Sequence, residues 1–97
     1  MADENSRKSE QEVDGVPVYL PDNLKASSFC NNIIAQFSPE EFSIDFINMG
    51  AVHNAFVARI ALTPSHMKRF AKLTAQKVAE YEKMFGDIPE TIEEQNK

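Results

Sequence analysis

The chain of 97 residues has one cysteine, no tryptophan, three glycines and no long run of apolar residues. A single cysteine excludes a disulfide within the chain and fits a reducing compartment. A membrane-spanning helix needs about 20 apolar residues in succession, and no segment approaches that length. The first residues, MADENSRKSEQEVDG, are polar and lack the apolar core of a secretory signal. We therefore expect a cytoplasmic protein that has no membrane partner.

The chain also lacks the short motifs that hold metals, phosphates or activated nucleophiles. Its two histidines are His53 and His66, and it contains no HExxH, paired CxxC or GxSxG motif. Cys30 has no histidine near it in the sequence, so a buried structural thiol on a strand explains it better than a nucleophile. Glu40 and Glu41 stand in a turn, where capping or solubility accounts for carboxylates as well as chemistry does. We expect a protein that is not an enzyme and that binds no cofactor or metal.

The net charge of −5 is concentrated at the two ends of the chain. Residues 1–14 hold five acids against two bases, residues 87–97 hold four acids against one base, and the middle holds six acids against seven bases. The ends also have few apolar residues, so we expect disordered acidic tails over residues 1–14 and 89–97. A nearly neutral centre without an aromatic stacking platform argues against nucleic acid as a partner.

Three segments, FCNNIIAQF, FSIDF and AFVARIAL, alternate between apolar and polar residues. This alternation predicts half-buried strands of an antiparallel sheet. The connections SPEE and NMGAVHN join the strands into a meander over residues 28–62. Residues 15–24, GVPVYLPDNL, contain Pro17 and Pro21, which cannot donate to a sheet ladder. We expect these residues to form an extended arm, lying either on its own core or on a partner chain.

One long helix is predicted over residues 64–85. Thr63 is a good N-cap and Pro64 suits the first helical position, while Gly86 and Pro89 end the helix. An apolar stripe steps alternately by four and three residues. Its members are Met67, Ala71, Thr74, Val78, Tyr81 and Phe85. The predicted fold is therefore a single α+β domain over residues 15–88, in which this helix covers the inner face of a three-stranded antiparallel meander.

The outer face of the meander is too apolar for open solvent and too polar for a core. Asp45 and Arg59 fall at facing positions of neighbouring strands on this face. They form either a surface ion pair or a pair inside an interface between copies of the chain. A three-stranded sheet with one helix is also a marginal monomer, so we expect a homodimer or a higher homo-oligomer. The candidate interface residues are Ile34, Asp45, Ile47, Val57 and Arg59.

The charges of the predicted helix run against its dipole. Lys68, Arg69 and Lys72 crowd the positive N-terminal end, while Glu80, Glu82 and Asp87 lie near the negative end. One explanation is that these cations lie on a solvated face and interact with acidic residues elsewhere in the chain, such as those of the N-terminal tail. The other is an anion site for a phosphate, an acidic partner segment or a nucleic-acid backbone. Its candidate residues are Thr63, Ser65, His66, Lys68, Arg69 and Lys72.

The ordered segments FCNNIIAQFSPEEFSIDF, RIALTPSHMKRF and YEKMFGDI resemble a family of small bacterial and archaeal proteins, the domain of unknown function three-four-six-seven. The family pattern has Tyr-Ala-Asn first, where this chain keeps Asn31 and has Phe29 and Cys30 in the other two places. Matching residues follow at Glu41, Phe42, Asp45, Phe46, Arg59, Ile60, Thr63, Pro64, Lys68, Tyr81, Glu82, Phe85 and Gly86. The resemblance covers about residues 28–88 and implies a compact cytoplasmic protein, without implying any activity.

These observations favour a non-enzymatic, self-associating binding or scaffold protein with a protein partner of unknown identity. The alternative is a regulator that binds an anion or nucleic acid at the basic start of the helix. A third interpretation is a client-binding chaperone, because oligomers of sheets and long helices with apolar grooves can hold unfolded chains.

Overall fold

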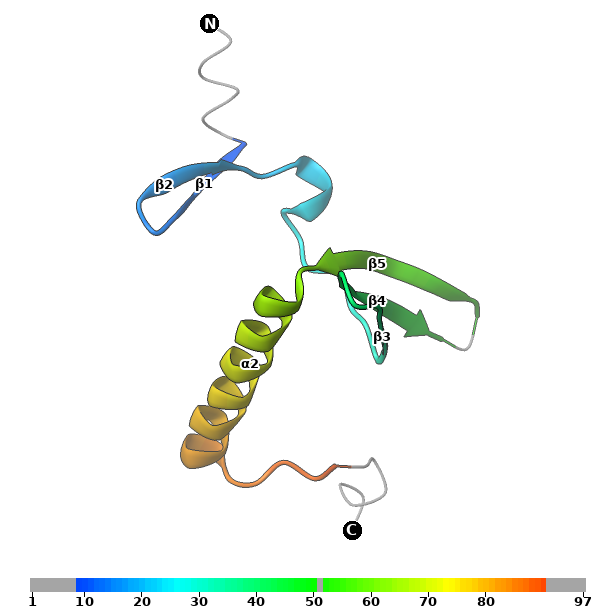
Figure 1. Ribbon diagram of the computed structural model, residues 1–97, viewed down its shortest axis with the longest axis vertical. Helices are drawn as coiled ribbons and strands as arrows, with labels where there is room; N and C mark the ends of the chain where they lie inside the picture. Colours follow the sequence, from blue (N-terminus) through cyan, green and yellow to red (C-terminus); the bar gives the residue numbers. More distant parts are fainter. Residues whose placement is uncertain (1–8, 51, 91–97) are drawn as a thin grey trace, which may run out of the picture. The chain divides into compact units, whose positions relative to one another are not determined.

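The computed structural model of the chain describes residues 9–50 and 52–90 (Figure 1). Its elements are β1 (Glu10–Val13), β2 (Val16–Tyr19), the 3₁₀ helix η1 (Asp22–Leu24), β3 (Asn32–Phe37), β4 (Phe42–Met49), β5 (Asn54–Leu62) and α2 (Pro64–Phe85). The predicted α+β class is confirmed. The chain divides into two compact units, one made of the residues up to Ile33 together with Phe46–Ala58, the other of Ile34–Asp45 together with the residues from Arg59 onward.

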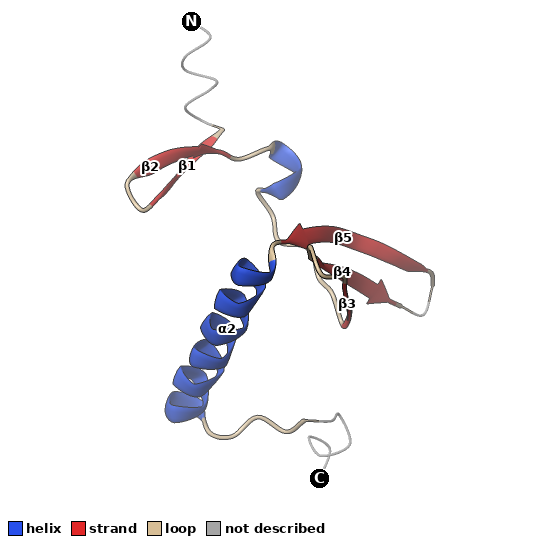
Figure 2. Cartoon of the chain, viewed as in Figure 1, coloured by secondary structure: helices blue, strands red, loops and turns tan. Residues whose placement is uncertain are grey.

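The predicted meander is confirmed as a three-stranded sheet in the order β3-β4-β5 (Figure 2). Each connection has four residues, too few for the crossover that parallel neighbours need, so the strands run antiparallel. The backbone N–H of Ser38 donates to the carbonyl of Glu41 at 2.9 Å and closes the first turn. The rings of Phe37 and Phe42 lie 5.6 Å apart, which confirms that these two residues meet across the turn.

Asn31 holds the start of the sheet in place of regular strand pairing. Its side-chain amide donates to the carbonyl of Met49 at 2.9 Å, and its side-chain oxygen accepts from the N–H of Met49 at 2.8 Å. Its own backbone N–H donates to Ile47 at 3.0 Å. β3 therefore begins at Asn32 and not at residue 28, and the prediction that Cys30 lies on a strand is wrong. The side chain of Asn31 takes the hydrogen bonds that another strand residue would have made.

We expect Asn31→Ala to lower the free energy of unfolding by about 1–3 kcal/mol, because two hydrogen bonds worth about 0.5–1.5 kcal/mol each are lost. Asn31→Asp should also destabilise the fold, because it keeps the acceptor but sets a carboxylate oxygen against the carbonyl of Met49. Urea denaturation of these variants beside Asn32→Ala measures the difference. If Asn31→Ala and Asn32→Ala unfold at the same urea concentration, the bridge to Met49 contributes nothing.

Residues 10–19 form a β-hairpin where we expected a disordered tail and an extended arm. β1 and β2 pair antiparallel, with Val13 opposite Val16 and Glu12 opposite Pro17. The turn is Asp14–Gly15, and both residues have positive φ, 53° and 79°. That combination is the type I′ turn, for which Asp-Gly is a strong sequence signal. Residues 1–8 of the predicted tail lie outside the described residues, as do residues 91–97.

Pro17 is compatible with the hairpin because of its register. The N–H of Leu20 donates to the carbonyl of Ser9, which makes Ser9 and Leu20 a hydrogen-bonded pair. Hydrogen-bonded and non-hydrogen-bonded pairs alternate along an antiparallel ladder. The pair of Glu12 and Pro17 therefore falls at a non-hydrogen-bonded position, where the missing N–H of proline faces away from the partner strand.

The helix α2 begins and ends where the sequence predicts. The Thr63 side chain accepts from the N–H of His66, and Pro64 occupies the first turn. Gly86 has a φ of 95°, and its N–H donates to Glu82 at 2.9 Å. No residue of α2 is buried, although its apolar stripe was expected to face the core. That the helix covers the inner face of the sheet stays a prediction.

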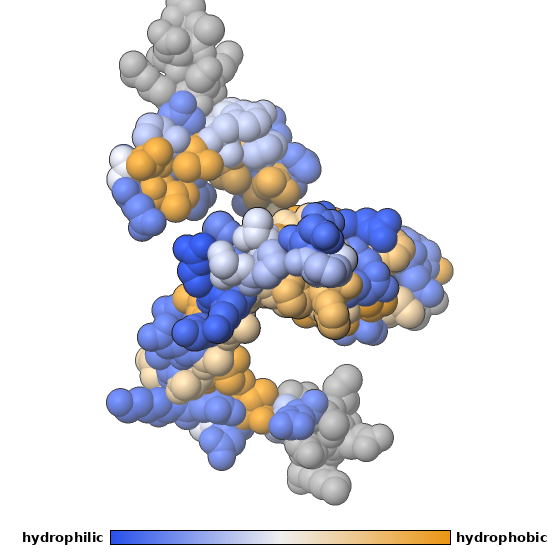
Figure 3. All heavy atoms as spheres, in the orientation of Figure 1, coloured by the Kyte–Doolittle hydropathy of each residue, from blue (hydrophilic) through white to orange (hydrophobic). Residues whose placement is uncertain are grey.

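Few apolar side chains are buried within the chain. Among the described residues only Ile44 and Ile47 are buried, with 4% and 8% of their surface exposed, and both belong to β4. β4 is the central strand of its sheet and has a neighbour along both edges. Figure 3 shows apolar side chains on the visible surface of the hairpin, of the sheet and of the helix. No helix in the described ranges is long and apolar enough to cross a membrane.

Candidate functional site

Asp45 of β4 and Arg59 of β5 form the cross-strand pair that the sequence predicts. The Nε of Arg59 donates to Oδ1 of Asp45 at 3.0 Å. The Asp45 side chain is 15% exposed and the Arg59 side chain 72% exposed. The shielded carboxylate is therefore held by a cation that reaches into solvent. An exposed pair of this kind contributes about 0.2–1 kcal/mol, whereas the same pair inside an interface would leave a costly buried charge if one partner were lost.

The other candidate interface residues differ in exposure. Ile34 and Val57 remain exposed at 44% and 36%, next to the ion pair along the strands. Ile47 is 8% exposed within the single chain. Whether Ile34, Asp45, Ile47, Val57 and Arg59 form an interface stays a prediction.

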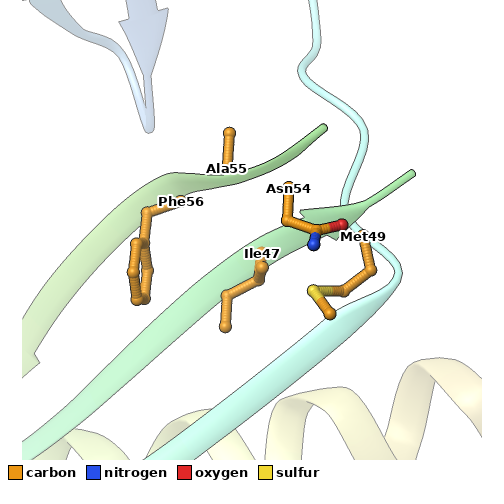
Figure 4. Close-up of a pocket in the computed structure, with 5 residues that line it drawn as sticks. All are labelled: Ile47, Met49, Asn54, Ala55 and Phe56. Atoms are coloured by element: carbon orange, nitrogen blue, oxygen red, sulfur yellow. The ribbon is translucent and has the colours of Figure 1, made fainter. Parts of the chain in front are cut away.

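A shallow apolar pocket of about 170 Å³ lies between the end of β4 and the start of β5 (Figure 4). It is lined by Ile47, Met49, Asn54, Ala55 and Phe56. Pockets that bind small molecules usually measure about 300–1,000 Å³ and contain a few polar groups that orient the ligand. This one is smaller, and its size suits a single apolar side chain better than a metabolite.

The candidate anion site at the start of α2 uses much of its hydrogen-bonding capacity internally. The Thr63 hydroxyl lies 3.3 Å from the backbone nitrogen of His66 and 3.0 Å from Nδ1 of its ring. Arg69 turns back to Ser65, where its guanidinium lies 3.3 Å from the side-chain oxygen and 3.5 Å from the carbonyl. The structure therefore brings together Thr63 with His66 as an N-cap, and Ser65 with Arg69 as a side-chain pair one turn apart.

The two remaining cations, Lys68 and Lys72, are exposed on α2. At the other end of the helix, Glu82 accepts from the backbone N–H of Ile88 at 2.9 Å, so this carboxylate caps the chain beyond the helix. Lys77 and Glu80 pair at 3.3 Å. Local hydrogen bonds thus account for the positions of some of the charged residues on α2. These hydrogen bonds do not explain why Lys68 and Lys72 lie near the positive end of the helix.

We expect Thr63→Ala to lower the free energy of unfolding by about 0.5–2 kcal/mol, because the first turn of α2 loses its side-chain cap. Ser65→Ala is the matched control, since it also removes a hydroxyl from the first turn but caps no backbone N–H. Circular dichroism during thermal unfolding measures both variants. Equal melting temperatures for Thr63→Ala and Ser65→Ala would mean that the Thr63 cap does not contribute to stability.

The residues that carry reactive groups do not gather into a catalytic constellation. Cys30 is half-buried in the segment before β3, and His53 is exposed in the connection to β5. The carboxylate of Glu40 lies 3.3 Å from the hydroxyl of Ser38, as expected of a turn residue. Within residues 9–50 and 52–90, no three His, Cys, Asp or Glu side chains are arranged so that they could hold a metal ion.

The apolar stripe of α2 is exposed in the single chain. Val78, Tyr81 and Phe85 are 46%, 51% and 69% exposed. Steps of four and three residues are typical of a seam between two helices as well as of a core-facing stripe.

The comparisons with known proteins identify a family but no function. The model of the family described as "Protein of unknown function (DUF3467)" matches residues 1–90. No curated protein and no solved structure matches the chain. The match extends over nearly the whole sequence and includes the motifs around Asn31, Asp45, Arg59 and Tyr81. The chain therefore belongs to the DUF3467 family.

Proposed function

We propose that this chain is a non-enzymatic, self-associating binding or scaffold protein, which completes its fold only against a second copy. The observation that carries the proposal is the exposure of its aromatic residues. Seven of its nine aromatic side chains are at least 39% exposed, and all nine lie within the described residues. They are Tyr19, Phe29, Phe37, Phe56, Phe70, Tyr81 and Phe85.

The exposed aromatic surface is large enough for an interface. A fully buried aromatic side chain hides about 150–250 Å², so these seven leave roughly 900 Å² in contact with water. A standard interface takes about 800 Å² from each partner. These side chains are spread over the hairpin, the sheet and the helix, and a second copy would cover part of them.

The small buried core of the single chain supports the same conclusion. Among the described residues only Ile44 and Ile47 are buried. A second copy that covers the apolar faces would supply the missing burial.

The proposal that the protein is not an enzyme is supported by the chemistry of its pockets and polar clusters. The apolar pocket beside Ile47 contains no titratable side chain among its lining residues. The polar groups at Thr63 and Ser65 make a helix cap and a side-chain hydrogen bond from Arg69. We infer a role in which surfaces, and not reactive groups, perform the function.

Thermal unfolding at several protein concentrations tests self-association. If folding is coupled to association, the melting temperature should rise by about 3–4 °C for each tenfold increase in concentration. The rise follows because a more concentrated sample shifts the equilibrium toward the associated, folded form. A melting temperature that is independent of concentration from low micromolar to millimolar would contradict the proposal.

A further inference from the structure

The helix α2 carries a regular apolar seam along its full length. The steps of the stripe alternate between four and three residues, from Met67 to Phe85. This spacing averages 3.5 residues and is the pattern of a helix that packs against another helix. Neighbouring members already touch, because the rings of Tyr81 and Phe85 lie 5.0 Å apart. The seam is a preformed surface on a helix of 22 residues.

The polar member of the seam is prepared for burial. The hydroxyl of Thr74 donates to the carbonyls of Phe70 and Ala71, at 3.0 and 3.1 Å. A hydroxyl that is satisfied within its own helix leaves no unpaired donor when a second helix covers it. The seam can therefore be covered along its whole length without a penalty at its centre.

The sizes of the seam residues fit an antiparallel pair of identical helices. Placing Phe85 opposite Met67 of a second copy also places Tyr81 opposite Ala71 and Val78 opposite Thr74. The large Tyr81 then meets the small Ala71, and the alternation of large and small groups lets the two surfaces interdigitate. A parallel pair would instead stack Tyr81 on Tyr81 and leave Ala71 facing Ala71.

The charges on one flank of the seam also fit this orientation. Lys68 follows Met67 and Glu82 follows Tyr81, so the two occupy equivalent positions on one flank of the seam, 14 residues apart. In the antiparallel register, Lys68 of one copy lies about 3 Å along the axis from Glu82 of the other. In a parallel pair the two Lys68 side chains would lie on opposite flanks of the seam, far from Glu82 of the partner. In the antiparallel pair Lys68, one of the cations that oppose the helix dipole, faces an acid.

We propose that two copies of this chain associate through their α2 helices, packed antiparallel along the seam from Met67 to Phe85, with Lys68 of each copy paired with Glu82 of the other. The inference rests on the self-association proposed above and names its surface and orientation. Of the seam and its border, Phe70, Tyr81 and Phe85 alone expose roughly 300 Å², a large share of the about 800 Å² that a standard interface needs from each partner.

Charge reversal followed by mixing tests the pairing. Lys68→Glu and Glu82→Lys should each raise the dissociation constant of the homodimer about tenfold, because two attractive pairs become repulsive. Lys68→Glu also removes a cation that opposes the helix dipole, so its free helix should be more stable and weaker association cannot come from unfolding. An equimolar mixture of the two variants should form a heterodimer as tight as the wild type, since both of its pairs are again complementary. Lys83→Glu, on the far side of the helix, is the matched control.

Sedimentation velocity and circular dichroism distinguish the outcomes. Dissociation constants for both reversals equal to that of Lys83→Glu would overturn the helix pairing and leave self-association to another surface. A mixture that associates no more tightly than its components would overturn the antiparallel orientation. A wild-type chain that stays monomeric, with its seam covered by its own sheet, would overturn both this inference and the proposed function.

Discussion

Ile44→Ala should lower the free energy of unfolding by about 2–5 kcal/mol, a large part of the about 5–15 kcal/mol that holds a small domain together. Ile44 is 4% exposed, and it and Ile47 are the two buried side chains of the described chain, on opposite faces of β4. Its truncation removes one of the few buried apolar groups and leaves a cavity. Urea denaturation at one fixed protein concentration measures the effect.

Val52→Ala provides the control for that experiment. Val52 is 93% exposed, so its truncation should change the unfolding free energy by no more than about 0.5 kcal/mol. If Ile44→Ala and Val52→Ala have the same effect, the interior of the fold lies elsewhere than in β4.

Val78→Glu should raise the dissociation constant of the self-associated form about a hundredfold. Val78 lies at the middle of the α2 seam, so each dimer would enclose two carboxylates without partners. In the free chain Val78 is 46% exposed, and glutamate has a higher helix propensity than valine. The loss should therefore concern association and leave the helix itself intact.

Sedimentation velocity and circular dichroism of Val78→Glu beside Gln76→Glu separate these effects. Gln76→Glu adds the same negative charge on the side of the helix away from the seam. We expect Gln76→Glu to associate like the wild type. Equal association of the two variants would show that the seam is not the contact surface.

The sheet and the helix could be predicted because local patterns determine them. The alternation around Ile44 and the capping residues Thr63 and Gly86 act within a few residues of where they stand. The hydrogen bond between Asp45 and Arg59 followed from the same alternation, since a period of two sets which residues face each other. In a meander with short turns, the alternation and the turn lengths together determine the register of the strands.

The hairpin of β1 and β2 was missed because one rule was applied without its exception. The rule that proline cannot donate to a sheet ladder argues against a strand at Pro17, yet Pro17 pairs with Glu12 at a position that needs no N–H. The Asp14–Gly15 turn contained the positive signal for the hairpin. The start of β3 was misplaced for a different reason, since the sequence alone does not reveal that the Asn31 side chain replaces a backbone pairing.

The sequence identifies the candidate site residues but does not determine which contacts their side chains make. Ile47 is a candidate interface residue, and the sequence does not show that it is only 8% exposed in a single chain. Arg69 is a candidate for the anion site, and the sequence does not reveal that it bonds to Ser65 on its own helix. Side chains as long as arginine have many rotamers, so sequence position does not determine which oxygen they reach.

Sedimentation equilibrium of the unmodified chain at micromolar concentration tests the central claim most directly. The claim is that a second copy covers the apolar surface that one copy leaves exposed, the aromatic side chains above all. The account predicts a mass that is twice the 10.9 kDa of the single chain, or a higher whole multiple of it. A single species of 10.9 kDa at micromolar concentration would contradict the claim that a second copy covers this surface.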